Sequence, residues 1–211
     1  MKAVHWRMLI GGALILAGLL ALVNSFTGVD LGGLVWAFLF VVGGAAFIIS
    51  MAENKKNWWA AIPGFTLLGI GALIGVGELA PPVAETYGGA IVLGSIGVSF
   101  LVVYLLNPTA WWAIIPAGVM FSLTAMIALE PVMDETVVIF FLGLAATFGV
   151  LALLPIDDGK RTNWPLYPAG ALLIVGLIIG ISAEGWAGYL MPLILIILGG
   201  YLVIRALRAR A

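Results

Sequence analysis

Three glutamates are spaced so that a fold could bring their carboxylates to one place. Glu78, Glu130 and Glu184 each follow a tryptophan by 19 or 20 residues. Carboxylates that are gathered together can bind a cation, and they raise one another's pKa. The alternative is that all three are loop charges in contact with solvent. The spacing therefore indicates a possible external cation site, which needs elements that place the three side chains at equivalent positions.

The sequence offers few other groups for catalysis or ligand binding. It has no cysteine, and His5 is its single histidine, so thiolate and bis-histidine sites are excluded. It also has no HExxH pattern and no glycine-rich phosphate loop between a strand and a helix. We therefore expect no enzymatic activity, no catalytic residue, no cofactor and no metal site. The net charge of −1 gives no reason to expect a nucleic acid partner.

The composition is typical of a membrane protein. Of the 211 residues, 64% are hydrophobic and 9% are charged, with a mean hydropathy of +1.22. A soluble domain carries about 25% charged residues. The 28 glycines suit membrane helices, where small residues let backbones approach closely. Lipid must therefore surround most side chains, and membrane lipids are expected partners.

Eight apolar runs are long enough to span a bilayer, whose core of about 30 Å needs about 20 helical residues. They cover residues 6–23, 31–51, 58–76, 87–106, 111–129, 136–154, 164–183 and 186–204. Lys2, His5 and Arg7 precede the apolar part of the first run, residues 8–23, which could instead be a signal peptide. It matches later segments of the same chain, which favours a span. We therefore predict an all-α integral membrane protein with eight transmembrane helices.

The charges separate cleanly between the two sets of loops. All nine basic residues fall on one side: Lys2, Arg7, Lys55, Lys56, Lys160, Arg161, Arg205, Arg208 and Arg210. The opposite loops carry only acidic residues: Asp30, Glu78, Glu85, Glu130, Asp134, Glu135 and Glu184. Because cytoplasmic loops are rich in Lys and Arg, we predict the inner membrane as the location, with both termini in the cytoplasm.

A tryptophan pattern indicates an internal repeat. Trp6, Trp58, Trp111 and Trp164 lie 52, 53 and 53 residues apart, and self-similarity at a fixed period marks repeated units. The repeats cover about 6–51, 58–106, 111–154 and 164–207, within a single domain of residues 1–211. Each would be one helical hairpin, and all four hairpins would have the same orientation.

The tryptophans themselves suit the membrane interface, where indole rings concentrate. We predict interfacial anchors at Trp6, Trp58, Trp59, Trp111, Trp112 and Trp164. A cofactor or quinone platform is the alternative. Asn57 and Asn163 suit a helix N-cap, and Pro63, Pro116 and Pro168 suit a first helical turn.

A stripe of small residues lies deeper in the later copies of the first helix of each hairpin. Spacings of seven and four place its members on one helix face: Gly64, Gly71, Gly75, then Ala117, Thr124, Ala128, then Ala169, Gly176, Gly180. The first repeat has Gly11 and Gly18, but Leu22 breaks its stripe. Small side chains allow close helix packing in lipid, so we predict that the stripe faces other helices. A pore-lining face is the alternative.

The pattern Trp58-Trp59-x-x-Ile62-Pro63-Gly64, followed by a glycine-spaced apolar helix, resembles the transmembrane region of LiaI/LiaF-type bacterial proteins. It is also similar, more loosely, to the hairpins of HdeD-like acid-resistance membrane proteins. The likeness covers the chain as four units, without the extramembrane domain of the LiaF kind. The resemblance implies a role related to envelope stress and supplies no catalytic residue.

These observations predict a non-enzymatic multi-pass membrane protein with a structural, scaffolding or envelope-stress-related role. It would pack against lipids, against itself or against another membrane protein. One alternative is a channel or transporter for a small solute, with its path between hairpins. Another is an accessory or lipid-binding subunit of a larger membrane complex.

Overall fold

The structure is a computed structural model that describes residues 32–154 and 162–181, with isolated positions 11–12, 14–15, 18–19, 22–23, 25–26 and 196. Every regular element between residues 32 and 181 of this part is helical. The elements are α2 (Gly32–Glu53), η1 (Lys55–Ala60), α3 (Ala61–Leu79), α4 (Pro81–Leu106), η2 (Trp111–Ala113), α5 (Ile114–Leu129), α6 (Val137–Leu153) and α7 (Leu166–Ile181).

Among the described residues, four helical stretches are long and apolar enough to cross a membrane. They are Gly32–Glu53, Lys56–Leu79, Pro81–Leu106 and Trp111–Leu129. α6 and α7 are shorter, with 17 and 16 residues, which corresponds to about 24–26 Å of helix. The protein is therefore all-helical in its described part and compatible with an α-helical membrane protein. The spans expected at 6–23 and 186–204 lie outside the described residues, apart from isolated positions.

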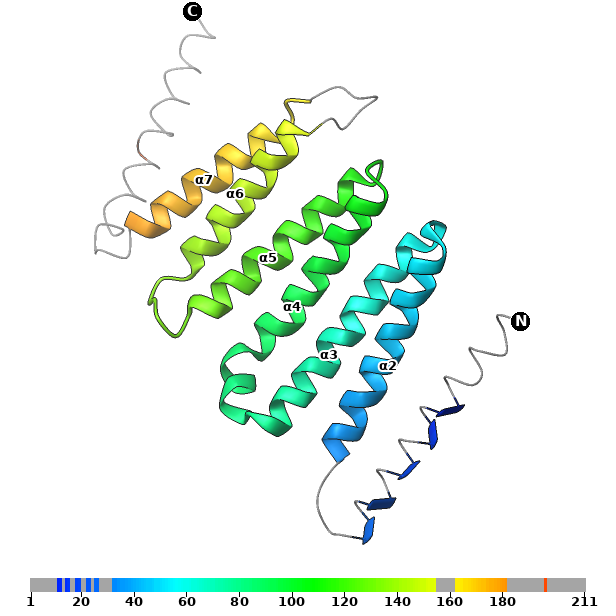
Figure 1. Cartoon of the computed structure of the whole chain (residues 1–211). Helices are drawn as coiled ribbons and strands as arrows, with labels where there is room; N and C mark the ends of the chain where they lie inside the picture. Colours follow the sequence, from blue (N-terminus) through cyan, green and yellow to red (C-terminus); the bar gives the residue numbers. More distant parts are fainter. Residues whose placement is uncertain are drawn as a thin grey trace, which may run out of the picture.

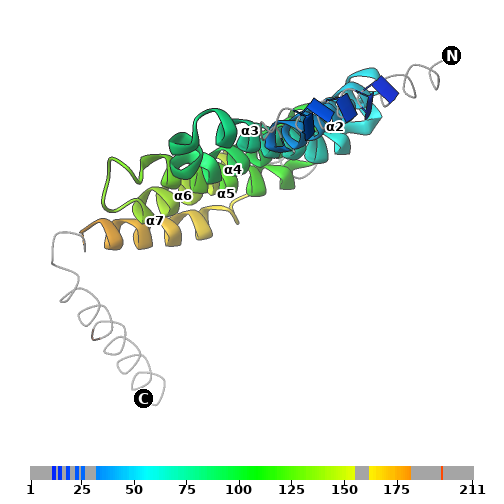
Figure 2. The ribbon, with the colours of Figure 1, turned by 90° about the horizontal axis from the view of Figure 1, so that it is seen from below.

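The helices stand side by side in a single row, in the order of the sequence (Figure 1). Each long helix packs chiefly against the helix before it and the helix after it, because short connections make antiparallel neighbours of consecutive helices. Seen from below, the row is a thin layer rather than a bundle around a central axis (Figure 2). Among the described residues the row is open, with α2 and α7 at its two ends (Figure 1).

Proline and asparagine determine where several helices begin. α4 begins at Pro81 rather than at residue 87, because prolines at the first two helical positions need no N–H partner. Pro63, Pro116 and Pro168 each occupy the third position of their helix, as expected for residues that lack a backbone donor.

The expected cap at Asn57 is wrong. The N-cap of η1 is Asn54, whose side chain accepts a hydrogen bond from the Lys56 amide at 3.0 Å. Asn57 instead donates from its side-chain amide to Ser50 Oγ at 3.2 Å, back in α2. Its own backbone is non-helical, so it marks the bend between two short helical pieces. This hydrogen bond joins residues seven positions apart, so the local sequence pattern does not predict it.

The charged side chains gather at the two edges of the row, where the helices begin and end. Glu53 and Lys56 are exposed at the connection between α2 and α3. The exposed acidic residues of the α3–α4 and α5–α6 connections lie at the other end of the helices (Figure 1). They are Glu78, Glu85, Glu130, Asp134 and Glu135. The segments between these two ends contain no Lys, Arg, Asp or Glu in residues 32–52, 57–77, 86–129, 136–154 and 162–181.

Candidate functional site

The structure describes two of the three glutamates of the predicted cation site. Glu78 lies near the end of α3 and Glu130 directly follows α5, and both are exposed. α4 stands between these two helices in the row (Figure 1), and the Glu78 carboxylate lies over the backbone of Gly33 in α2. Within the described ranges, no three acidic or histidine side chains are grouped to hold a metal ion. Glu184 lies outside those ranges, so the three-glutamate site stays a prediction.

The tryptophans near the helix starts fall into two classes. Trp58 and Trp111 are half-buried, and Trp58 packs against a small core of Ala61, Val103, Ala110 and Ala113. By contrast, 52% of the surface of Trp59 is exposed, and 42% of that of Trp112 and of Trp164. Trp59, Trp112 and Trp164 therefore lie at the surface while part of each ring is still covered by its neighbours. Trp6 lies outside the described residues.

Each of these three exposed tryptophans packs edge-on against a phenylalanine of the preceding helix. The ring centroids of Phe47 and Trp59 are 6.3 Å apart at 74°. Phe100 and Trp112 are 6.2 Å apart at 75°. Phe148 and Trp164 repeat the arrangement at 6.3 Å and 74°. Edge-to-face pairs are favourable because the positive ring edge meets the negative ring face.

These partners align Trp164 with Trp59 and Trp112, one position away from the alignment that the 53-residue spacing of Trp58, Trp111 and Trp164 suggests. Trp111 also contacts Trp164, with centroids 6.3 Å apart. Sequence reasoning missed the phenylalanines. The available signal was the recurrence of Phe and Trp twelve residues apart at 47/59 and 100/112.

The small-residue stripe of α3 lies against α2. A Cβ built on Gly71 would stand 2.8 Å from Val41 Cγ2 and 2.9 Å from the carbonyl oxygen of Ala37. A Cβ on Gly64 would stand 2.7 Å from Ile48 Cδ1. Gly75 is looser, at 3.9 Å from Ala37. At Gly71 the neighbouring atoms include backbone, so α2 and α3 touch there almost backbone to backbone, whereas at Gly64 the nearest atom is the end of the Ile48 side chain.

The corresponding residues of α5 and α7 also turn toward the preceding helix. Thr124 of α5 lies 3.4 Å from a Cβ built on Gly94 of α4. In α7, a Cβ on Gly176 would stand 3.2 Å from Phe141 Cβ, and one on Gly180 would stand 3.6 Å from Val138, both in α6. Ala117 is 3% exposed, whereas Ala128 and Ala169 are half-buried. The stripe therefore lies mainly between consecutive helices of the row.

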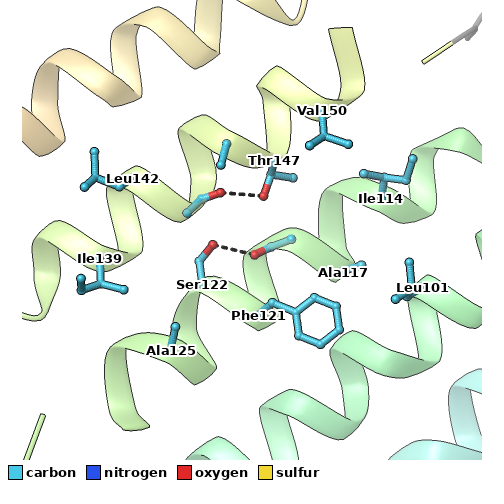
Figure 3. A pocket seen from close by; sticks show the side chains of 13 residues that line it. Leu101, Ile114, Ala117, Phe121, Ser122, Ala125, Ile139, Leu142, Thr147 and Val150 are labelled. Atoms are coloured by element: carbon cyan, nitrogen blue, oxygen red, sulfur yellow. Dashed lines mark hydrogen bonds between the residues drawn. The ribbon is translucent and has the colours of Figure 1, made fainter. Parts of the chain in front are cut away.

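α5 and α6 approach through a reciprocal pair of glycines and hydroxyls. Gly118 of α5 faces Thr147 of α6, and Gly143 of α6 faces Ser122 of α5. Ser122 donates to the Gly118 carbonyl at 2.7 Å, and Thr147 donates to the Gly143 carbonyl at 2.8 Å (Figure 3). Each hydroxyl thus bonds to its own helix, while the same side chain, its oxygen included, fills the space over the other helix's glycine.

Three further hydroxyls within the apolar helices also bond to their own helices. Ser95 donates to the Val92 carbonyl at 2.7 Å and packs over Gly69 of α3. Ser99 and Thr124 donate to the carbonyls of Ile96 and Met120, at 2.6 and 2.8 Å. Such bonds back to the helix are common for Ser and Thr. In the described helices, these donors are therefore occupied and do not form a polar path.

A groove of about 550 Å³ runs along α5, between α4 and α6. Its floor holds buried residues, among them Ala117, Ser122 and Thr147. Its rim holds exposed apolar side chains, among them Leu101 of α4, Phe121 of α5 and Val150 of α6 (Figure 3). A second hollow of about 470 Å³ lies between α6 and α7, where a Cβ on Gly149 or Gly170 would meet nothing within 4 Å among the described residues.

Sequence reasoning predicted the small residues but not the grooves. Small side chains allow either a close contact or a hollow, and only the relative rotation of three helices decides which one forms. The chain matches no protein family model, no curated protein and no solved structure.

Proposed function

We propose that this chain is a non-enzymatic multi-pass protein of the cytoplasmic membrane with a structural or scaffolding role. It would have eight spans in four tandem hairpins of one orientation, with both termini in the cytoplasm. A role related to envelope stress, implied by the resemblance to LiaI/LiaF-type proteins, belongs to the same proposal. The observation that carries it is the single open row of apolar helices in the described part, in which five hydroxyls bond to carbonyls of their own helices: Ser95, Ser99, Ser122, Thr124 and Thr147.

The repeated aromatic contacts support the four-hairpin arrangement. Phe47–Trp59, Phe100–Trp112 and Phe148–Trp164 occur at the α2–α3, α4–α5 and α6–α7 connections. These are the three junctions between the proposed repeats. Centroid distances of 6.2–6.3 Å and angles of 74–75° fit units that join in the same way each time.

The placement of charge supports the orientation. Lys56 lies at one edge of the row, where helices begin and end, and five exposed carboxylates lie at the opposite edge. Lys and Arg mark the cytoplasmic side, which puts the end with Lys56 in the cytoplasm. Lys55, the first residue of η1, is adjacent to Lys56, and the other seven basic residues, outside the described ranges, follow the same rule in the sequence.

The shape of the row supports a scaffolding role rather than catalysis or transport. A layer one helix thick leaves broad apolar faces exposed, with Trp36 and Ile49 on α2 and Val83 and Leu105 on α4. In a membrane, such faces meet lipid, a second copy or another membrane protein. A solute path would need a polar cavity, whereas the hollow along α5 and the one between α6 and α7 are almost wholly apolar.

The accessory, lipid-binding alternative has one observation in its favour, the open apolar groove along α5. A lipid-binding subunit and a scaffold differ in which molecules contact the exposed apolar faces. A scaffold should contact protein at defined positions, whereas a lipid-binding subunit need contact only lipid there.

A photocrosslinking experiment tests the proposal. Benzoylphenylalanine is placed at Trp36 or Val83, both exposed, and at Ser99, which is 0% exposed, as a control. In native membranes, the scaffold gives a defined protein adduct from the exposed positions and only intrachain products from position 99. Lipid adducts alone at every exposed position would contradict it. Glycerol or ion flux through proteoliposomes of the purified chain, above that of empty vesicles, would favour the channel instead.

A further inference from the structure

The groove between α4, α5 and α6 has a length and a lining that point to one kind of occupant. We propose that it holds one acyl chain of a membrane phospholipid. The inference rests on the proposed membrane location and adds to it a defined lipid site.

The lining is suited to hydrocarbon. Of its thirteen residues, eleven are apolar or glycine, and the other two are Ser122 and Thr147. Both hydroxyls already donate to carbonyls of their own helices, Ser122 to Gly118 and Thr147 to Gly143 (Figure 3). No lining side chain carries a charge. A polar ligand would lose its hydration here without gaining new donors, whereas an acyl chain loses nothing.

The groove has the length of one leaflet. It follows α5 from Ile114 to Ala125 and α6 from Ile139 to Val150, and each of these stretches is about 16 Å long at 1.5 Å per residue. Half of a hydrocarbon core of about 30 Å is about 15 Å. The groove starts at the first residue of α5, at the same edge of the row as the α2–α3 connection with Lys56 (Figure 1). Its occupant would therefore come from the leaflet on that side.

The surroundings supply the occupant. The groove is open along its side, and the helices that form it carry no charged residue in 86–106, 114–129 and 137–153. If it stayed empty, its walls would lose the dispersion contacts that a filled groove has. Lipid chains are the molecules that reach this surface, and the rim of Leu101, Phe121 and Val150 can hold one chain over a floor of small residues.

The test uses purified protein in phosphatidylcholine vesicles with a trace of phosphatidylcholine that carries a diazirine in one acyl chain. After illumination, labelled residues are mapped by mass spectrometry. We expect the strongest adducts at Leu101, Phe121 and Val150, several-fold above those at Val41 and Val83, which are similarly exposed on α2 and α4. An even spread over all exposed apolar positions would overturn the proposal.

Two variants sharpen the result. Ala146→Phe and Ala125→Phe each add a ring at the groove, and Ala72→Phe adds the same ring at an exposed position of α3. The groove variants should lower labelling of the rim about fivefold, which corresponds to about 1 kcal/mol, and Ala72→Phe should leave it unchanged. Unchanged rim labelling in both groove variants would overturn the proposal. If the groove variants do not fold, the wild-type pattern alone decides.

Other outcomes separate the inference from the proposed function. Crosslinks at the rim to a second copy of the chain, or labelling only by a free diazirine fatty acid, would overturn the phospholipid site and leave the membrane location intact. Absence of lipid adducts everywhere on the chain would instead contradict the membrane location on which both proposals depend.

Discussion

Gly71 and Ala72 are neighbours in α3 with opposite surroundings. Gly71 is buried against the backbone of α2, whereas Ala72 is exposed. In lipid, association depends on close packing rather than on a hydrophobic driving force. A position such as Gly71 therefore contributes to stability through the absence of a side chain.

We expect Gly71→Leu to lower the free energy of unfolding by about 1–3 kcal/mol, the usual range for overpacking. The carbonyl of Ala37, 2.9 Å from the Cβ position, is backbone and cannot move aside. Gly176→Leu should cost less, because its nearest atoms belong to the Phe141 and Leu142 side chains. Denaturant titration in mixed micelles measures both. Ala72→Leu and Ala171→Leu, at exposed positions, are the controls and should change stability by less than about 0.5 kcal/mol. Equal stability of Gly71→Leu and Ala72→Leu would show that the stripe is not a packing face.

At the scale of elements, each helix that follows a basic-side connection is held to the preceding helix in two ways. An aromatic pair joins them near the connection, and small residues join them at depth. Among the described residues, nothing lies within 4 Å of a Cβ on Gly11 or Gly18, and Leu22, which breaks the stripe, is exposed.

The aromatic pair at the α4–α5 junction can be tested by a double-mutant cycle. Phe100→Leu and Trp112→Leu, alone and together, should show a coupling energy of about 0.5–1.5 kcal/mol, as expected for an edge-to-face pair. Phe100→Leu combined with Trp59→Leu is the control, because these residues belong to different junctions. That pair should be additive within about 0.5 kcal/mol. Additivity of both pairs would mean that the rings are in contact without stabilising the junction.

At the scale of the whole molecule, a row of sequential neighbours behaves like a one-dimensional array. Stability in such arrays is close to a sum of unit and neighbour terms. The connections at one end join proposed hairpins, and those at the other end lie within hairpins (Figure 1). All members of one set of connections should therefore face the same side of the membrane.

Cysteine labelling tests this orientation. The chain has no cysteine, so Lys56→Cys and Glu85→Cys each introduce a single thiol at an exposed site. In intact cells, an impermeant thiol reagent should label position 85, and position 56 should react only after the membrane is opened. The reason is that α3 separates the two sites and basic residues stay in the cytoplasm. The same accessibility at both sites would contradict the eight-span arrangement. Thr109→Cys, at the α4–α5 connection, should behave like Lys56→Cys.

The sequence by itself determined the properties that are read locally along the chain. Hydropathy predicted the helices from 32 to 181 to within about three residues, apart from α4, which begins at Pro81, six residues before the predicted start. The prediction works because a helix in lipid satisfies its own backbone hydrogen bonds. Charge predicted which connections share a side. The stripe at Gly64 and Gly71 could be predicted too, because its spacing follows helical periodicity.

Only the tertiary structure decided which surfaces meet. The partners Phe47, Phe100 and Phe148, the bond from Asn57 to Ser50, and the exchange of glycine and hydroxyl between α5 and α6 all depend on how far each helix is rotated and shifted against its neighbour. The groove along α5 depends on three helices at once. Local periodicity gives the face of one helix, but the fit between faces is a property of pairs and triples, and so it appears only when the helices are packed.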